Sequence, residues 1–255
     1  KSLTDSEPYM SLNIEVSIID IFVIWNYGPN KVTKPLSFSG TLINDLDNRS
    51  LSEIYNWFVD SFNADKYIIF DDDSCLVSGL SPYLVDNCSD LILPRIKDGG
   101  KYFYPINSSG TILSCENEIV HKKIFSITSG LCFNQDTVNY LKSMFGNVFD
   151  EDFAFYGVDT SFFYRVNMIK NIKLSIGGEI YHSLSKNSSE DLVTSNFRKA
   201  ERIKDLALQV RKYRSFMAIK SSLKVLIISA VNCEWMLIFI YFQTLVKLHN
   251  GKLGI

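Results

Sequence analysis

The sequence predicts an α/β fold, with a sheet flanked by helices, in residues 1–190 and a helical extension in residues 191–255. Three observations predict it. Short apolar runs alternate with segments of helical spacing in the first part of the chain, which favours a sheet with crossover helices. The apolar run from Lys66 to Phe70 ends abruptly at three aspartates. After residue 190 the chain becomes basic and then strongly apolar, with the spacing of amphipathic helices.

The composition is that of one sizeable globular domain, or of a domain with an appendage. The 255 residues are 46% hydrophobic and 21% charged, which is enough for a full core. A formal net charge of −2 gives no overall electrostatic signature of nucleic-acid binding. The five cysteines are odd in number, widely spaced and without a Cys-x-x-Cys pair. They therefore favour a reducing compartment over a disulfide framework or a zinc site.

Strands and helices are expected to alternate up to the three aspartates. Glu7 follows Thr4 at the spacing of a capping box, which predicts an early helix. Residues 26–30, Asn-Tyr-Gly-Pro-Asn, are a strong turn signal after an apolar run. The expected elements are a helix over 2–12, a core strand over 21–25, a weaker strand over 41–43, a helix from Ser50 or Ser52 to Phe62, and a buried strand over 66–70. This order favours a parallel sheet.

Turn and breaker residues divide the segment beyond the aspartates. Pro94 is expected to break a strand and Gly146 to end a helix. The expected elements are a strand over 91–96, a helix over 136–145, a helix over 160–167 and a strand over 172–176. Residues 177–182 are then expected to return towards the aspartates.

The extension contains two segments of different character. Residues 197–213 predict a basic amphipathic helix, whose charged face suits an anionic membrane surface, a pyrophosphate-bearing substrate or plain solvent. Residues 225–246 hold Glu234 as their only formal charge and are long enough to span a bilayer. Because a central Glu is costly inside a membrane, we expect one docked or interfacial helix instead of a span. The extension is thus expected to dock on the domain or to make a peripheral membrane contact.

Two acidic clusters carry the candidate chemistry. Asp71, Asp72 and Asp73 follow a buried strand, where unpaired carboxylates are costly unless a cation compensates them. A divalent cation that holds a diphosphate is one interpretation, since Mg²⁺ and Mn²⁺ prefer oxygen ligands. A solvated acidic turn is the other. The second cluster, residues 149–159, contains Asp159 at an expected helix start, where local N–H groups favour a carboxylate.

Four motifs occur in one order along the chain: residues 48–56 (Asn-Arg-Ser-Leu-Ser-Glu-Ile-Tyr-Asn), Asp71-Asp72-Asp73, Phe149-Asp150-Glu151, and Val158-Asp159-Thr160 with Arg165 six residues after Asp159. Together they resemble the bacterial family-2 glycosyltransferases of GT-A fold, and in particular those that build O-antigen and capsule. The resemblance covers residues 2–182 and the tail 250–254. It implies a Rossmann-like mixed sheet flanked by helices.

The resemblance also implies a metal site and a donor site around the aspartates. Asp71 and Asp73 would hold Mn²⁺ or Mg²⁺, with His182 beside the metal. The residues implied to contact a nucleotide diphosphate sugar are Asn26, Asn48, Asp71 and Asp72.

The catalytic base follows from the resemblance as well. Asp159, with Arg165 six residues later, is implied to remove the proton of the acceptor hydroxyl. Glu151 and Asp152 are the other candidates, unless they orient the acceptor or cap a turn. Residues 129–130, Ser-Gly, would line the acceptor side.

Two positions depart from the family. Members begin with an apolar strand that ends in a pair such as Tyr-Asn, whereas residues 1–4 match the segment after that strand. We therefore expect the first strand to be absent. Asn26 stands where the family usually has Asp, and it can hydrogen-bond an amide or hydroxyl without carrying a charge.

The sequence therefore predicts a metal-dependent inverting glycosyltransferase of the hexosyltransferase type. It would move a sugar from a nucleotide diphosphate sugar to a polyprenyl-diphosphate-linked saccharide at the inner, cytoplasmic face of the bacterial membrane. The alternatives are an inactive glycan-binding or scaffolding module that retains the fold, and a Mg²⁺-dependent nucleotidyltransferase.

Overall fold

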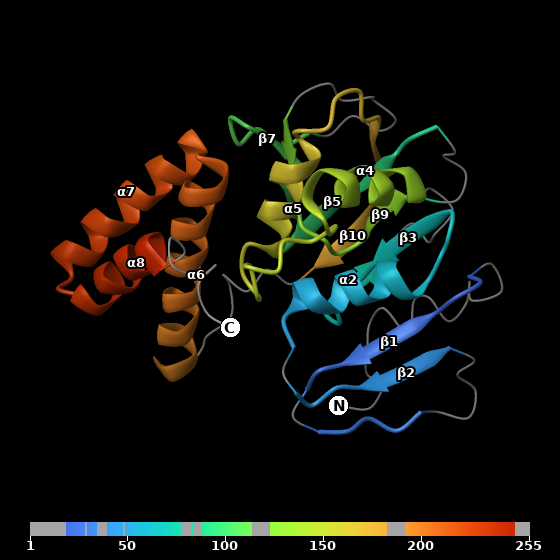
Figure 1. Cartoon of the computed structure of the whole chain (residues 1–255), viewed down its shortest axis with the longest axis horizontal. Coiled ribbons are helices and arrows are strands. Elements are labelled where there is room, and N and C mark those ends of the chain that lie inside the picture. The colour runs from blue at the N-terminus through green and yellow to red at the C-terminus, as the bar shows by residue number, and fades with distance from the viewer. Residues whose placement is uncertain are drawn as a thin grey trace.

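A mixed sheet forms the centre of the fold, as the computed structural model of the chain shows (Figure 1). Its strands lie in the order β3 (Lys66–Ile69), β9 (Leu131–Asn134), β5 (Leu91–Asp98), β10 (Leu174–His182) and β4 (Ser74–Leu76), and β6 (Lys101–Tyr104) pairs with β5. A parallel pair, β1 (Val23–Asn26) and β2 (Thr41–Asn44), and an antiparallel pair, β7 (Ile106–Asn107) and β8 (Ile124–Phe125), lie apart from it.

The structure describes residues 19–28, 30–34, 40–47, 49–77, 83, 88–113, 123–182 and 192–247. The helix expected over 2–12, Asn48 of the donor site and the tail 250–254 lie outside these residues.

The expectation of a parallel sheet is wrong for most strand pairs. Among the described strands of the central sheet only β5 and β10 run parallel, whereas β9 is antiparallel to both β3 and β5, and β10 is antiparallel to β4. The reason is that β9 comes from far along the chain and inserts between β3 and β5. The local alternation of strands and helices carries no signal for that insertion. The mixed sheet that the resemblance implies is what forms.

Successive strand residues face two different cores. Leu93 and Phe133 point into the main core, and their neighbours Ile92 and Cys132 point to the other side, where Tyr83 covers them. The helices that pack on the main core side are α2 (Leu51–Ser61), α4 (Gln135–Phe145) and α5 (Val158–Val166). One face of the sheet is therefore covered by these three helices.

The predicted helix boundaries are set by capping residues. At the start of α2, Glu53 N donates to Ser50 Oγ at 3.2 Å and Ser50 N donates to Glu53 Oε2 at 3.0 Å, which completes a capping box. Gly146 ends α4 in the left-handed conformation, with φ 85°. The predicted start at Ser50 and end at Gly146 are confirmed.

The strand expected to break at Pro94 continues past it as β5. Pro94 lies between the pairs Leu93–Ile176 and Arg95–Glu179, where the register of β5 against β10 shifts. Pairing with β9 has already ended before this point. A residue without an N–H group is tolerated at such an irregularity, so the prediction of a break is wrong.

Three helices follow the sheet domain: α6 (Leu192–Tyr213), α7 (Phe216–Val231) and α8 (Trp235–Lys247). In Figure 1, α6 lies between the domain and the hairpin that α7 and α8 form, and its Leu208 belongs to the main core. The basic helix expected over 197–213 is confirmed. The single helix expected over 225–246 is wrong, because the chain turns at residues 232–234, where Cys233 has φ 58° and Glu234 N donates to Ser229 O at 2.8 Å. Among the described helices, none has the length and apolar character needed to cross a membrane.

Candidate active site

The three aspartates form the turn between β3 and β4. Ser74 N donates to Asp71 O at 3.1 Å, which reverses the chain between the two strands. Asp71 is half-buried, whereas Asp72 and Asp73 are exposed. The turn therefore holds one carboxylate inside the site and two at its rim.

Strand pairing brings His182 to the same place. β10 runs antiparallel to β4 with His182 opposite Ser74, and Ser74 Oγ lies 2.8 Å from His182 Nδ1. Asp73 Oδ1 is 3.2 Å from the same nitrogen. One ligand atom each from Asp71, Asp73 and His182 lies within 4.8 Å of the others. The three residues expected to hold a metal thus converge, although more than a hundred positions of sequence separate Asp73 from His182.

The donor set of this cluster fits a divalent cation. The two carboxylates suit Mn²⁺ or Mg²⁺, and three protein ligands would leave further coordination positions for diphosphate oxygens. Burial, together with the nearby charges of Asp159 and Asp73, raises the pKa of Asp71 to about 7, against the effect of Tyr55 OH, which donates to Asp71 Oδ1 at 3.2 Å. A bound cation would relieve this repulsion between carboxylates.

Asp159 stands in the first turn of α5, near enough to this cluster to interact electrostatically with Asp71 and His182. Its Oδ1 accepts hydrogen bonds from Thr128 N at 3.1 Å and from Thr128 Oγ1 at 2.7 Å. Burial raises the pKa of Asp159, while the two Thr128 hydrogen bonds and the charge of His182 act in the opposite direction. The electrostatic coupling of Asp159 to Asp71 and His182 means that the expected base and the expected metal ligands share one site.

Ser129 and Gly130 are buried behind the aspartate turn and do not line an acceptor surface. Ser129 is fully buried, its Oγ lies 2.5 Å from Ser74 Oγ, and Asp71 N donates to it at 3.2 Å. Gly130 has φ 73°, and a Cβ there would lie 1.9 Å from Ile180 Cδ1. The expected acceptor role of this pair is replaced by positioning of the aspartate turn.

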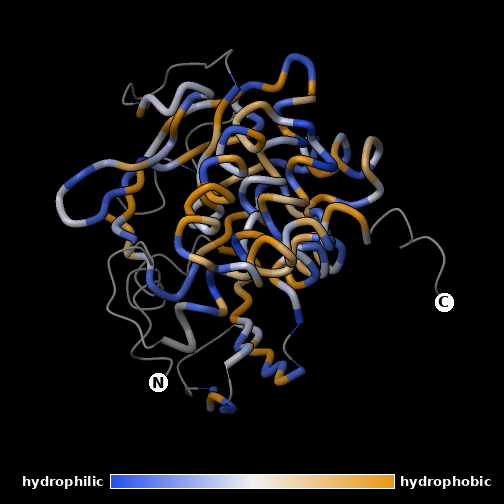
Figure 2. The backbone as a smooth tube through the Cα atoms, turned by 90° about the vertical axis from the view of Figure 1, so that its left-hand side faces the viewer, coloured by the Kyte–Doolittle hydropathy of each residue, from blue (hydrophilic) through white to orange (hydrophobic). Residues whose placement is uncertain are grey.

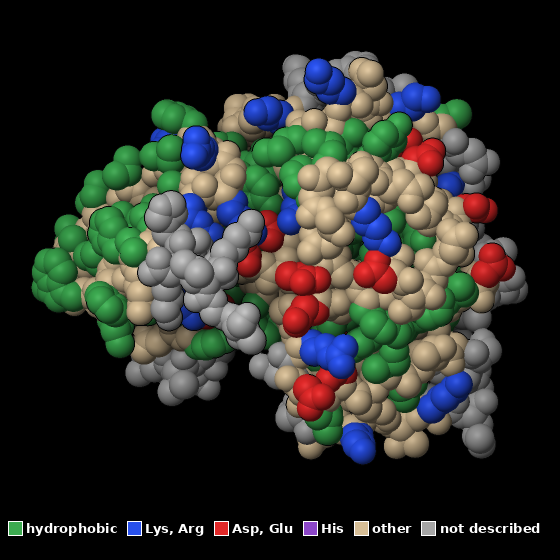
Figure 3. Space-filling model, viewed as in Figure 1, with side chains coloured by type: hydrophobic (Ala, Val, Ile, Leu, Met, Phe, Trp, Pro, Cys, Tyr) green, Lys and Arg blue, Asp and Glu red, His purple; other side chains and the backbone are tan. Residues whose placement is uncertain are grey.

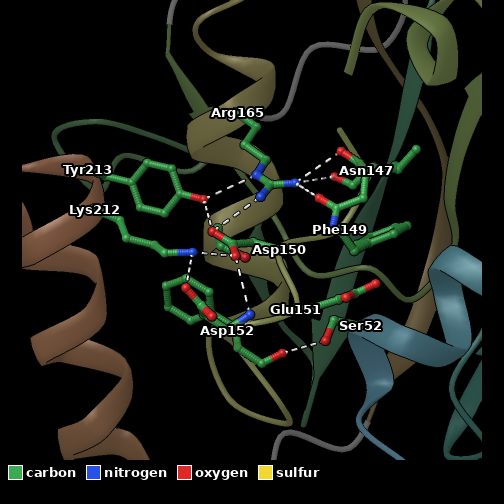
Figure 4. Close-up of polar contacts among 12 residues, drawn as sticks. Ser52, Asn147, Phe149, Asp150, Glu151, Asp152, Arg165, Lys212 and Tyr213 are labelled. Atoms are coloured by element: carbon green, nitrogen blue, oxygen red, sulfur yellow. Dashed lines mark hydrogen bonds and ion pairs between the residues drawn. The ribbon is translucent and has the colours of Figure 1, made fainter. Parts of the chain in front are cut away.

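The second acidic cluster is bound by other side chains (Figure 4). Asp150 is 4% exposed, lies 3.3 Å from Arg165 Nη2 and accepts from Lys212 Nζ at 2.6 Å and from Tyr213 OH at 2.8 Å. Asp152 pairs with the same Lys212. The carboxylates of Asp150 and Asp152 therefore connect the domain to α6.

Glu151, the other candidate base, is also engaged. Asn56 Nδ2 donates to Glu151 Oε1 at 2.9 Å and to Phe149 O at 2.9 Å, which fixes the loop on α2. Arg165 donates to the carbonyl oxygens of Asn147 and Val148 and so holds the same loop from α5. Glu151 and Asp152 thus have structural partners, and Asp159 is the candidate base that interacts electrostatically with the expected metal ligands Asp71 and His182.

At the end of β1, Asn26 is engaged in local structure and Tyr27 interacts electrostatically with the aspartates. Asn26 Nδ2 donates to Asn44 Oδ1 at 2.7 Å and to Asn30 O at 2.8 Å, so its side chain holds the loop after β1. Burial and the charges of Asp71, Asp73 and Asp72 raise the pKa of Tyr27, so its hydroxyl interacts electrostatically with the three carboxylates. Sequence reasoning read Tyr27 only as part of a turn.

No family model and no curated protein matches this chain. Among solved structures it is similar to S. aureus TarS, a GT-A-type wall teichoic acid glycosyltransferase, with a TM-score of 0.50 and 10% sequence identity. The fold is of the GT-A type. The match covers 84% of this chain and 43% of TarS, so the chain spans less than half the length of that protein.

A cavity of about 170 Å³ lies between the GT-A domain and the C-terminal helices. Asp159 and Tyr164 line it from α5, Leu206 and Gln209 from α6, and Met217 from α7. The residue expected to act as base therefore borders a space that the helical extension helps to form.

Asp205 of α6 is a further acidic residue at this place that sequence reasoning missed. Burial and the charge of Asp159 raise its pKa to about 6, although Gln209 Nε2 donates to Asp205 Oδ1 at 2.8 Å. A Cβ on Gly157, the residue before α5, would lie 1.9 Å from Asp205 Oδ1, so α6 packs tightly on the start of α5. Asp205 is one of two acidic residues in a basic helix, which is a weak signal, and only the packing shows its neighbours.

Proposed function

We propose that this chain is a metal-dependent inverting glycosyltransferase that uses a nucleotide diphosphate sugar as donor. The observation that carries the proposal is the meeting of Asp71, Asp73, His182 and Asp159 at one site of a GT-A fold. These residues come from the β3–β4 turn, the end of β10 and the start of α5.

In this proposal Asp71, Asp73 and His182 hold Mn²⁺ or Mg²⁺. When bound, the metal stabilises the negative charge that develops on the departing nucleoside diphosphate. Tyr55 orients Asp71 through its hydrogen bond, and the exposed Asp72 contacts the donor. Asn26 acts indirectly, because its side chain already holds the loop that presents Tyr27.

Asp159 takes the proton of the acceptor hydroxyl. The hydroxyl oxygen then bonds to the anomeric carbon on the face opposite the diphosphate, and the bond from that carbon to the diphosphate oxygen breaks. Thr128 occupies Asp159 Oδ1 with two hydrogen bonds, so we assign the proton to Oδ2. A carboxylate whose pKa is raised by burial is a stronger base than a solvated one, which suits this role.

The acceptor we propose is a polyprenyl-diphosphate-linked saccharide of surface polysaccharide synthesis, used at the cytoplasmic face of the membrane. The sequence resemblance to O-antigen and capsule enzymes supports this class, and so does the similarity to a wall teichoic acid glycosyltransferase. Glu151 and Asp152 keep the loop before α5 in place, because both are held by partners on other helices.

The test is thermal unfolding of the full chain with each nucleoside diphosphate, with and without Mn²⁺. At a hundredfold excess over the dissociation constant, binding adds about 2.7 kcal/mol of stability. We expect a metal-dependent rise in Tm with one nucleotide, which Asp73→Ala abolishes and the exposed control Asp65→Ala retains. Metal-dependent cleavage of a nucleotide sugar that is unchanged in Asp73→Ala would overturn the proposed metal site.

A further inference from the structure

The outer surface of the α7–α8 hairpin is apolar. Seven large side chains there are at least 61% exposed: Phe216, Ile227, Val231, Trp235, Met236, Phe239 and Val246. Figure 3 shows hydrophobic side chains over the end of the molecule that α7 and α8 occupy. Seen from that side, many hydrophobic residues follow the helical coils nearest the reader (Figure 2).

Most of the large apolar side chains of α7 are exposed. The fully buried residues of this helix are small, namely Ala218, Ser222 and Ser229, while Val225 and Leu226 are partly buried against α6 and α8. The large apolar residues of the same helix, such as Ile227 and Val231, face outward. A helix that packs only within a soluble domain buries its large apolar face. This outward face therefore exists for a partner that is itself apolar.

The helical extension carries a net positive charge. Residues 192–247 contain ten Lys and Arg against three Asp and Glu, in a chain whose formal net charge is −2. Lys220 and Lys224 are exposed on α7, and neither α7 nor α8 contains an acidic residue. Glu234, between the two helices, lies 2.8 Å from Lys199 Nζ and is thereby neutralised. The partner thus combines an apolar interior with negative charge at its surface.

We propose that this partner is an anionic lipid bilayer, and that the α7–α8 hairpin lies in the plane of the membrane with its outer face among the acyl chains. Trp235 at the turn suits the bilayer interface, and the lysine side chains can extend to lipid phosphates. A second copy of the chain fits less well, since a two-fold interface places the same patch against itself and would bring Lys220 and Lys224 near their own copies.

The membrane contact also bears on how the acceptor reaches the site, and this part of the inference rests on the proposed function. Met217 and Ala218 of α7 line the cavity that Asp159 borders. A hairpin held at the membrane surface would therefore place that cavity beside the headgroups. A saccharide carried by a membrane lipid could then reach Asp159 without leaving the bilayer.

The experiment is flotation of the full chain with vesicles, which needs no donor or acceptor. Vesicles that contain phosphatidylglycerol should carry the protein with them, and pure phosphatidylcholine should carry much less. Binding should fall at about 1 M salt, where the Debye length is about 3 Å. The variant Lys220→Glu/Lys224→Glu should bind at least about 25-fold more weakly, from about fivefold for each lysine. The control Lys123→Glu/Lys170→Glu makes the same charge change at exposed positions outside the hairpin.

A second pair of variants tests the apolar face. Ile227→Ser/Phe239→Ser should lower the affinity for anionic vesicles by at least about tenfold. The control Tyr140→Ser/Met144→Ser alters side chains of similar exposure on α4 and should leave binding unchanged.

Three results would overturn the inference: equal binding to neutral and anionic vesicles, no effect of the hairpin variants, or a stable dimer that Ile227→Ser/Phe239→Ser converts to a monomer. Metal-dependent nucleotide binding is a separate measurement. If it persists while vesicle binding fails, the membrane inference alone is wrong.

Discussion

Replacing Asp150 by Asn tests whether one buried carboxylate joins the acidic loop to α5 and α6. Asp150 is 4% exposed and lies 3.3 Å from Arg165 and 2.6 Å from Lys212. Arg165 is itself 6% exposed, and its other partners are neutral oxygens of Asn147, Val148 and Tyr213. Asn keeps the size of the side chain but leaves the buried guanidinium without a counter-charge.

The expected loss follows from this burial. Removing one partner of a buried ion pair costs about 3–5 kcal/mol. In a chain of this size each kcal/mol lowers Tm by about 2–4 °C, so Asp150→Asn should lower Tm by about 6–20 °C at pH 7. The matched control is Asp60→Asn, which removes a 2.6 Å pair with Lys142 whose side chains are 57% and 36% exposed. That surface pair is worth about 0–1 kcal/mol.

The pH dependence supplies a second readout. Burial alone would raise the pKa of Asp150, but the Lys212 hydrogen bond and the Arg165 charge outweigh it and hold the pKa below its usual value. A carboxyl group with a lowered folded-state pKa stabilises the fold above its unfolded-state pKa and loses that contribution as pH falls. The difference in free energy of unfolding between wild type and Asp150→Asn should therefore be largest at pH 7 and decrease below about pH 4. The reasoning is refuted by a loss below about 1 kcal/mol at pH 7, or by a gap that acidification does not change.

Three further substitutions address the site and its packing. Asp159→Asn should keep the Thr128 hydrogen bonds and nucleotide-dependent stabilisation but lower the rate of sugar transfer at least about 100-fold. An unchanged rate would mean that another residue is the base. The pKa of Asp205, raised to about 6, means that its ionisation destabilises the fold as pH rises through about 4 to 6. In denaturant titrations the free energy of unfolding of Asp205→Asn should therefore rise by up to about 3 kcal/mol relative to that of wild type between pH 4 and pH 8. Parallel pH profiles of the two proteins would contradict this. Gly130→Ala and Gly100→Ala share positive φ, 73° and 82°, but a Cβ lies 1.9 Å from Ile180 only at Gly130. Urea unfolding should show about 1–2 kcal/mol lost at Gly100 and about 1–3 kcal/mol more at Gly130, and equal losses would refute the steric argument.

The elements that the sequence predicted well are those with local signals. The capping box at Ser50 and the left-handed Gly146 set the ends of α2 and α4, because each depends on residues within one helical turn. The strand before Asp71 was predictable from its apolar run. The expectation of one helix over 225–246 failed because hydrophobicity alone does not show a turn such as the one at residues 232–234.

By itself the sequence determined the acidic turn after a buried strand, the basic charge of α6 and the order of motifs that resembles a GT-A enzyme. The tertiary structure alone decided which side chains meet. The pairing of β10 with β4 brings His182 to Asp73, and the packing of α6 on α5 brings Asp205 to Asp159. These contacts depend on strand register and on helix packing between distant segments. Register and packing are properties of the whole core, so no local pattern of residues encodes them.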